Sequence, residues 1–316
     1  MTSGSSRATS TTGSNADTPA ENPREAKDDR WLACRAVFAI ALGLAASLSW
    51  GVGDFLGGLQ SRRLPVVAVV LGSQLAGLAL VVAIVAIRGK PLPGGDFVVY
   101  AAASSVGGII GLTAFYKALS IGAMGVVAPL SSTAAVIPLV VGLASGDSLS
   151  ALQASGIALA ISGVVLASRE ASDEAKGSTA VAKGAGYALV SALGFGWFFV
   201  AIAHASDADV MWAVCVNRAV SALLLTAALL VTRPRLGLKL GDMRILVVIG
   251  VLDTGANGFF AVASTKGLVS VVAVLASLYP IVTVVLARFV LHERLRAIQR
   301  IGAAAALAGV ALISAG

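Results

Sequence analysis

Charged residues are scarce in this sequence. Asp, Glu, Lys and Arg make up 12% of the 316 residues, whereas hydrophobic residues make up 57%. An ordinary soluble domain carries about 25% charged residues, because its surface must face water. The composition therefore excludes a soluble globular protein and predicts an integral membrane protein whose outer surface faces lipid.

Cysteine and histidine are scarce as well. Cys34 and Cys215 form no CxxC pair, and His204 and His292 stand alone. These counts exclude a disulfide framework and give no ligand set for zinc. The sequence also contains no GxxxxGK[ST] phosphate-binding loop, so no ATP hydrolysis and no metal, haem or nucleotide cofactor are expected. The net charge of +7 does not indicate nucleic-acid binding, because the basic residues lie in short connectors rather than on one amphipathic face.

Long apolar runs are what the sequence has in abundance. A helix needs about 20 apolar residues to cross the bilayer core. Ten segments come close to this length, and they predict an all-α integral membrane protein with ten transmembrane helices. The segments are 36–56, 65–87, 97–116, 123–143, 149–167, 184–203, 210–231, 245–264, 268–290 and 298–315. Residues 1–34 are polar and lack apolar periodicity, which predicts a disordered tail that does not resemble a signal peptide.

The chain repeats itself. A shift of 145 positions places Gly51 on Gly196, Arg88 on Arg233 and Phe115 on Phe260, and a shift of 146 places Gly156 on Gly302 and Gly163 on Gly309. We interpret this as an internal duplication, with a first repeat at 35–168, a linker at 169–183 and a second repeat at 184–316. Each repeat holds five spans, so the second repeat enters the membrane with inverted orientation. Because ten is even, both termini should lie on the same side.

Several motifs resemble a known family. The first half contains Trp50-Gly51, Phe115-Tyr116-Lys117-Ala118-Leu119 and Val126-Val127-Ala128-Pro129-Leu130, and the second contains Ser277-Leu278-Tyr279-Pro280 and Leu291-His292-Glu293-Arg294-Leu295. These runs resemble EamA-type members of the drug/metabolite transporter superfamily. Asp147 and His292 depart from the family pattern, which usually has Glu and a Gly-Glu pair at these places.

The resemblance implies a multi-pass carrier of the inner or plasma membrane. Such a carrier is often an exporter of amino acids, metabolites or drugs. Its implied partners are a small-molecule solute and the lipid bilayer. The proton is a third partner where a proton gradient, rather than a solute gradient, drives transport. A pathway through ten spans can be enclosed within one chain, so a monomer and a homodimer are both compatible with the sequence.

Polar residues inside the predicted spans are the candidate site. A charge at the centre of a span costs about 2.5–3.5 kcal/mol on insertion scales. Arg218 lies near the middle of the seventh span beside Asn217, and Asp253 lies near the middle of the eighth, with Asn257 one turn further on. We therefore predict that Arg218 and Asp253 pair at one depth, either at a transport site or as a structural ion pair.

The first half contributes further polar residues. Gln74 lies one place from the repeat equivalent of Arg218, and Asp54 lies one turn after Trp50 near the end of the first span. Together with the residues of the second half, they predict a polar cavity lined by spans 1, 2, 7 and 8. The alternative for Asp54 is a polar residue at the membrane interface.

Prolines and tyrosines mark other candidate positions. Pro129 and Pro280 lie inside predicted spans, where each removes a backbone hydrogen bond, and the resulting kinks serve either gating or packing. Tyr116 and Tyr279 are cavity or gating candidates, but Tyr116 lies close to a span end and fits an interfacial aromatic belt better.

Two other functions are compatible with parts of the sequence. Gly51-Val52-Gly53-Asp54 matches the GxGD pattern of intramembrane aspartyl proteases, in which two carboxylates share a proton. Asp253 is the other intramembrane aspartate, but Leu252 precedes it where the protease motif has Tyr, and it follows the GxGD rather than preceding it. A channel or membrane scaffold is the second rival, and no filter-like repeat supports a channel. The sequence favours a transporter that is not an enzyme.

Overall fold

The computed structural model of the chain describes residues 23–144, 150–169, 178–234, 236–266, 275, 278–294 and 296–315. The regular structure in these residues is helical. The helices are α1 (Pro23–Gln60), α2 (Val66–Arg88), α3 (Phe97–Ile121), α4 (Met124–Ser132), the short 3₁₀ helix η1 (Thr133–Ala135), α5 (Val136–Ala144), α6 (Ala151–Arg169), α7 (Ser178–Ser206), α8 (Val210–Thr232), α9 (Leu240–Lys266), α11 (Tyr279–Val290) and α12 (Ala297–Ala315).

Ten apolar helical segments cross the bundle, as predicted. Six are long enough to span a membrane by length and composition: Val37–Gln60, Val66–Arg88, Phe97–Ile121, Lys183–Ser206, Val210–Thr232 and Leu240–Ala263. Four shorter apolar helices cover Met124–Pro138, Ala151–Gly163, Tyr279–Val290 and Arg300–Ile313. The all-α membrane fold with ten helical segments is therefore confirmed, and six of the ten are of membrane length. Of the predicted ninth span at 268–290, residues 268–274, 276 and 277 lie outside the described part of the chain.

Two predicted boundaries differ from the structure. Helix α1 begins at Pro23, so residues 23–34 of the predicted disordered tail are helical. Proline suits the first turn of a helix, so Pro23 can begin a polar segment that extends the apolar span. Helix α7 begins at Ser178, within the predicted linker. Residues 1–22 and 170–177 lie outside the described part of the chain.

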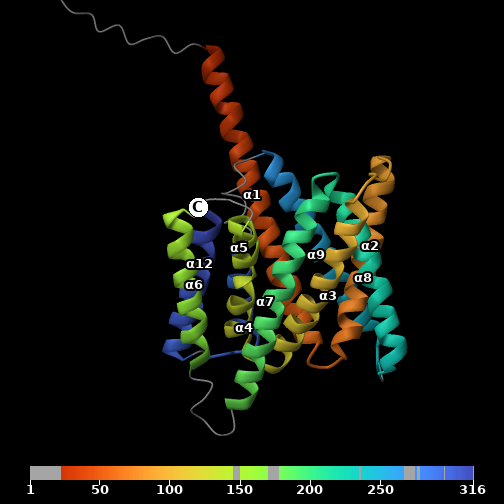
Figure 1. Cartoon of the computed structure of the whole chain (residues 1–316), viewed down its shortest axis with the longest axis vertical. Coiled ribbons are helices and arrows are strands. Elements are labelled where there is room, and N and C mark those ends of the chain that lie inside the picture. The colour runs from red at the N-terminus through yellow and green to blue at the C-terminus, as the bar shows by residue number, and fades with distance from the viewer. Residues whose placement is uncertain are drawn as a thin grey trace, which may run out of the picture.

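The two halves run in opposite directions. Helix α1 starts at the top of Figure 1 and runs downward, whereas α7, its counterpart in the second half, starts at the bottom and runs upward. The described chain accordingly begins and ends at the same end of the bundle, where the start of α1 projects beyond the other helices (Figure 1). This is the arrangement that five-span repeats require.

Glycine contacts between α6 and α12 show the two-fold relation between the halves. A Cβ atom on Gly156 would lie 2.8 Å from the carbonyl oxygen of Gly309, and one on Gly163 would lie 2.6 Å from the carbonyl oxygen of Gly302. The duplication maps Gly156 onto Gly302 and Gly163 onto Gly309, so each contact is the image of the other. Such an exchange is the mark of a two-fold axis.

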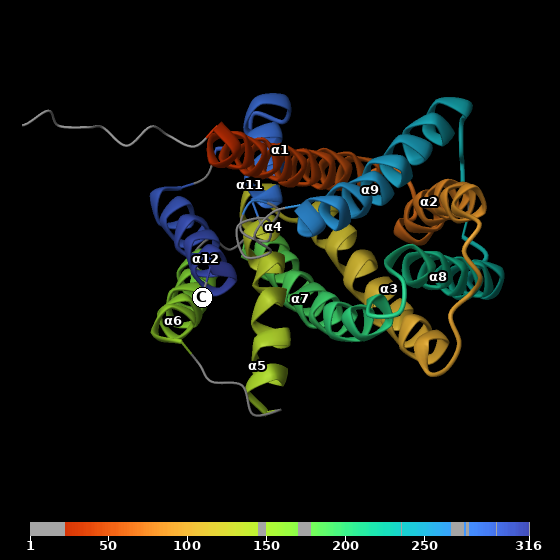
Figure 2. The same ribbon diagram turned by 90° about the horizontal axis from the view of Figure 1, so that it is seen from above.

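The remaining packing pairs follow the same axis. Helix α3 packs along α7 and α1 packs along α9, which are equivalent pairs in the two halves, while α2 packs on its own counterpart α8. Seen from above, the α6–α12 pair lies at one end of the molecule and the α2–α8 pair at the other (Figure 2). Small residues permit these close contacts: a Cβ on Gly107 would lie 2.7 Å from the carbonyl oxygen of Gly194.

The fourth span is interrupted, and the described helix of the ninth span begins at the related position. Helix α4 ends at Ser132, and the 3₁₀ turn Thr133–Ala135 separates it from α5. A shift of 145 maps Ala134 onto Tyr279, where α11 begins. Pro129 lies inside α4 as predicted, but Pro280 does not interrupt a helix. It occupies the first turn of α11, where there is no intrahelical hydrogen bond to lose, so it begins the helix instead of kinking it.

Candidate functional site

Three helices meet at a buried arginine. The Arg218 guanidinium on α8 forms an ion pair with Asp253 on α9, with Nη2 donating to Oδ2. Its Nη1 donates to Oε1 of Gln74 on α2 at 2.8 Å. The Arg218 side chain is only 6% exposed, whereas that of Asp253 is 30% exposed. The ion pair predicted from sequence is thus present, and Gln74 is its third member.

The open surface of Asp253 faces the interior of the bundle. Val262 lies on the exposed side of α9. It is nine residues from Asp253, which is two and a half turns at about 3.6 residues per turn, so the two side chains point in opposite directions. Leu246, seven residues before Asp253 and therefore close to its direction, is buried. The carboxylate is therefore reachable from within the protein and not from the lipid-facing side of α9.

Sequence reasoning missed Thr254, which lies beside the arginine. Thr254 Oγ1 and Arg218 Nε are both buried and have no hydrogen-bond partner among the described residues. Both approach Gly77 on α2, where an added Cβ atom would lie 3.5 Å from Arg218 Nε and would collide with the threonine hydroxyl. The second glycine in this contact is Gly250, which brings α9 against the backbone of α2. The one feature of the sequence that could have identified Thr254 as a site residue is its position next to Asp253.

Asp54 on α1 lies near this ion pair. It follows Gly53, where an added Cβ atom would lie 3.7 Å from the Cβ atom of Leu252, the residue before Asp253. The side chain is half-buried. Within the described residues Asp54 has no hydrogen bond and no ion pair, so it is an uncompensated carboxylate on the inner side of a membrane span.

Aromatic rings stand next to Asp54. Trp50 precedes it by one helical turn, and its ring centroid lies 6.1 Å from that of Phe260 on α9 and 6.3 Å from that of Tyr279 on α11. The ring of Tyr116 from α3 lies against Gly57, one turn after Asp54, where a Cβ atom would approach its hydroxyl to 2.5 Å. Tyr116 is 2% exposed, so the interfacial belt expected for it is wrong. Glycine at position 57 leaves room for the ring in the interior.

Three other predicted residues form no hydrogen bond with the Arg218 or Asp253 side chains in the described structure. Asn217 Nδ2 donates to Ser104 Oγ at 2.8 Å, so this side chain connects α8 to α3 and points away from Asp253. Successive residues on a helix differ by about 100°, which is why the neighbour of Arg218 faces another helix. Asn257 Nδ2 donates to the carbonyl oxygen of Asp253 in its own helix at 2.7 Å. Pro129 lies in α4, which packs on α7, α11 and α12.

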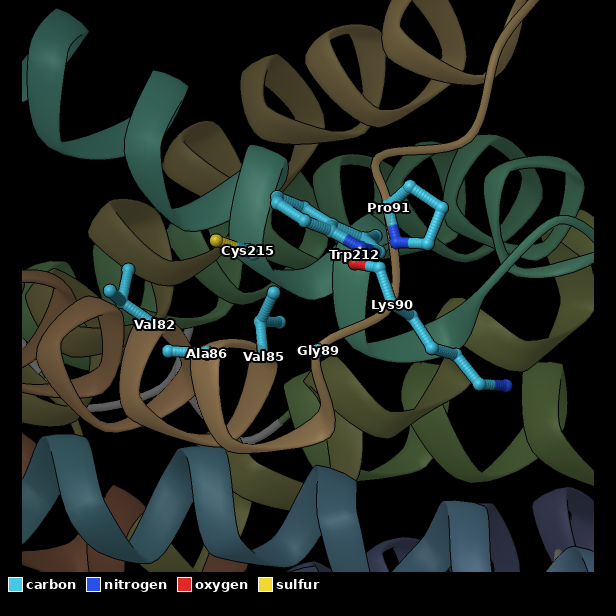
Figure 3. Close-up of a pocket in the computed structure, with 8 residues that line it drawn as sticks. All are labelled: Val82, Val85, Ala86, Gly89, Lys90, Pro91, Trp212 and Cys215. Carbon is cyan, nitrogen blue, oxygen red and sulfur yellow. Dashed lines mark hydrogen bonds between the residues drawn. The ribbon is translucent and has the colours of Figure 1, made fainter.

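A separate groove lies where α2 ends and α8 begins. Figure 3 shows its lining residues, and its volume is about 440 Å³. The residues are Val82, Val85, Ala86, Gly89, Lys90, Pro91, Trp212 and Cys215. The Lys90 ammonium extends away from Val82 and Cys215 (Figure 3), and Trp212 Nε1 donates to the Lys90 carbonyl oxygen at 3.1 Å. None of the residues around Arg218 lines this groove, so it is distinct from the candidate site.

Comparison with known proteins identifies the family. Both halves of the chain match the model of the EamA-like transporter family, at residues 37–169 and 182–315. A solved crystal structure is 17% identical with a TM-score of 0.60, over 87% of this chain and 96% of that one, which supports the fold alone. No curated protein sequence matches the chain. The two family matches coincide with the two five-span halves and cover most of the sequence, and this multi-pass membrane protein belongs to the EamA-like transporter family.

Proposed function

We propose that this protein exports a small metabolite, amino acid or drug across the inner or plasma membrane, driven by the proton gradient, and that Arg218, Asp253, Gln74 and Asp54 form its transport site. The observation that carries the proposal is the ion pair between Arg218 and Asp253, held by Gln74 within the bundle. Charges are expensive in a membrane interior and are found there mainly where they handle a solute or an ion.

The position of the cluster supports transport. Gln74 and Asp54 belong to the first half of the chain, whereas Arg218 and Asp253 belong to the second. In carriers built from inverted repeats, the site lies where the two repeats meet and is opened alternately to either side. Helix α11 begins at Tyr279, whose ring centroid lies 6.3 Å from that of Trp50, one turn before Asp54.

The cluster can couple a proton to a solute. A solute that binds the intact ion pair keeps Arg218 on Asp253, and this counter-ion disfavours protonation of the carboxylate. Solute and proton therefore exclude each other, so protons that move in can drive the solute out. The protease alternative requires Asp54 and Asp253 to share a proton, whereas Asp253 is bound to a guanidinium. Members of this family are generally not enzymes.

Flux measured in proteoliposomes tests the proposal. We expect saturable, pH-gradient-driven transport by the wild-type chain and its loss in Asp253→Asn and in Arg218→Gln. Matched controls are Asp207→Asn and Arg244→Gln, which change exposed residues outside the cluster and should leave flux unchanged. Unimpaired transport by Asp253→Asn would overturn the coupling role, and flux that does not saturate would point to a channel.

A further inference from the structure

The groove between the end of α2 and the start of α8 combines two kinds of surface. Apolar side chains line most of it, whereas the Lys90 ammonium extends away from Val82 and Cys215 at the other end (Figure 3). Its volume of about 440 Å³ falls within the usual range of small-molecule sites, about 300–1,000 Å³. A ligand that fills the whole groove is therefore amphipathic, with a polar group beside Lys90 and an apolar body.

The groove lies on the outside of the bundle, where the hydrocarbon of the membrane meets the headgroups. Helices α2 and α8 form one end of the molecule (Figure 2), and Val82 in the groove is 47% exposed. The apolar span Val66–Arg88 ends just before Lys90, and Trp212 lies in the first turn of the span Val210–Thr232. Tryptophan and lysine are typical of this boundary level. The apolar part of the groove thus lies at the depth of acyl chains, and Lys90 at the depth of headgroups.

Lys90 is a cation without a counter-ion in the described part of the chain. Arg88, two residues earlier, is paired with Asp209. The Lys90 side chain is exposed, and neither Asp209 nor the acidic residues of the adjoining loops, Asp96 and Asp207, form an ion pair with it. A basic side chain at headgroup level attracts anionic lipids. The polar group of the ligand should therefore be an anion.

Local contacts hold the groove in shape. Gly89 has a φ of +60°, in the left-handed region that favours glycine, and its N–H donates to the Val85 carbonyl oxygen, so the chain turns sharply where α2 ends. Trp212 Nε1 then donates to the Lys90 carbonyl oxygen, which fastens this turn to α8. A groove that is already formed binds its ligand at a lower cost in conformational entropy.

We propose that this groove binds an anionic phospholipid, with the phosphate beside Lys90 and an acyl chain along Val82 and Cys215, and that the lipid joins α2 of the first half to α8 of the second. A soluble phosphate compound has no chain to fill the apolar part of the groove. A zwitterionic lipid carries its own ammonium group, which competes with Lys90 for the phosphate. The inference goes beyond the transport function proposed above, and its test measures binding instead of flux.

Native mass spectrometry of the purified, delipidated full-length protein tests the inference. Dioleoylphosphatidylglycerol should bind about fivefold more tightly than dioleoylphosphatidylcholine, which corresponds to the attraction of one lysine for an anionic membrane surface. The difference should shrink as the ionic strength rises, and glycerol 3-phosphate should not displace the lipid. Lys90→Gln should abolish the difference. Lys239→Gln is the matched control, because Lys239 is an exposed lysine just before α9, and it should keep the wild-type preference.

A variant in the apolar part of the groove provides the second test. Ala86 lines the groove and is exposed, so Ala86→Phe should fill the groove without disturbing the core, and should weaken the binding of both lipids. Equal affinity of the two lipids for the wild type, a preference that survives Lys90→Gln, or wild-type binding by Ala86→Phe would each overturn the proposal. Displacement of the lipid by glycerol 3-phosphate would overturn the acyl-chain site. A wild-type dimer that Ala86→Phe converts to a monomer would assign the groove to a second copy of the chain, which also overturns it.

Discussion

Arg88 and Asp209 form a bidentate ion pair. The Arg88 Nη1 donates to Oδ1 at 2.8 Å and its Nη2 donates to Oδ2 at 2.7 Å. Asp209 also caps the start of α8, because Oδ1 accepts the backbone N–H groups of Met211 and Trp212. One carboxylate thus fastens the end of α2 to the beginning of α8. Arg233, the repeat equivalent of Arg88, donates instead to the carbonyl oxygen of Leu230 in its own helix, so the two halves have diverged here.

The Arg88–Asp209 pair should make stability depend on pH. The hydrogen bonds from the Arg88 side chain are the main cause that lowers the pKa of Asp209 from its usual 3.8 to about 2. A lowered pKa stabilises the folded state above about pH 4, and this contribution is lost as the pH falls toward 2. Asp209→Asn keeps the helix cap but removes the charge, so we expect a loss of about 1 kcal/mol at pH 7, since Arg88 is partly exposed and screened.

Thermal unfolding in detergent measures this difference. The melting temperature of Asp209→Asn should lie about 2–4 °C below wild type at pH 7, and the gap should narrow as the pH falls from 4 toward 2. Arg88→Gln should behave in the same way. Arg233→Gln is the matched control, since this arginine has no carboxylate partner in the described structure. A gap that stayed constant down to pH 2 would contradict the assignment.

Glu293 provides a second link between the halves. Its Oε1 accepts the backbone N–H of Met124 at 3.3 Å and its Oε2 accepts that of Gly125 at 3.2 Å, so it caps α4 from the end of α11. Arg62, which follows α1, donates to the same carboxylate at 3.5 Å. A carboxylate at a helix amino end is stabilised by the exposed N–H groups and the helix dipole.

Removing this cap should loosen the start of α4. In Glu293→Ala, hydrogen exchange at the amides of residues 124–127 should accelerate by about tenfold, which corresponds to about 1.4 kcal/mol of local stability. Glu293→Gln keeps an acceptor and should show a smaller effect. Arg294→Ala changes the next residue, which is exposed, and should leave exchange unchanged. Equal exchange rates in Glu293→Ala and wild type would show that α4 is held by its packing alone.

The span pattern could be predicted because lipid imposes a simple rule on composition. Apolar runs of membrane length and the duplication at a shift of 145 defined ten spans and their inverted order. The sequence alone did not show that the fourth span is interrupted at Thr133–Ala135. Pro129 and Pro138 flank it, but a proline indicates a weakened helix without showing which turn gives way.

The cluster was only partly predictable from sequence. Intramembrane charge identified Arg218 and Asp253, and the duplication pointed to Gln74, because α2 and α8 are repeat equivalents that pack on each other. The direction of Asn217 and the burial of Tyr116 depend on which helix stands opposite, and this is set by tertiary packing. The glycine at position 57 that admits Tyr116 becomes meaningful only once α3 is known to lie against α1.

The α3–α7 contact gives a prediction about packing. A Cβ atom on Gly107 would lie 2.7 Å from the carbonyl oxygen of Gly194, and one on Gly111 would lie 2.9 Å from the backbone nitrogen of Phe195. Gly107→Glu and Gly111→Lys should therefore push the helices apart and lower the yield of folded protein, at a cost of at least about 1–3 kcal/mol. Gly258→Ala is the control, because a Cβ atom there meets nothing within 4 Å.

Size-exclusion chromatography of the detergent-solubilised variants measures the folded yield. Gly258→Ala should elute as wild type does, whereas both charged variants should aggregate or fail to accumulate. Normal accumulation of Gly107→Glu or Gly111→Lys, together with an altered range of transported solutes, would assign these glycines to the transport pathway instead of the helix contact.

A further prediction concerns the ion pair between Arg218 and Asp253. Breaking a buried ion pair by removing one partner costs about 3–5 kcal/mol, because the other charge is left uncompensated. Asp253→Asn removes the counter-charge of Arg218, and Arg218→Gln removes that of Asp253. Both single variants should lose abundance as well as flux.

The double variant Arg218→Gln/Asp253→Asn separates the two roles of the pair. A pair that only holds α8 against α9 should be replaceable by two neutral side chains, so abundance and flux would return together. A pair that responds to the solute should regain abundance but remain inactive, because the carboxylate whose proton affinity changes with the position of Arg218 is gone. We expect abundance within about twofold of wild type in the double variant and no flux driven by a pH gradient. Purified yield measures abundance, and proteoliposome flux on the same preparations measures transport. An active double variant would show that the ion pair has only a structural role.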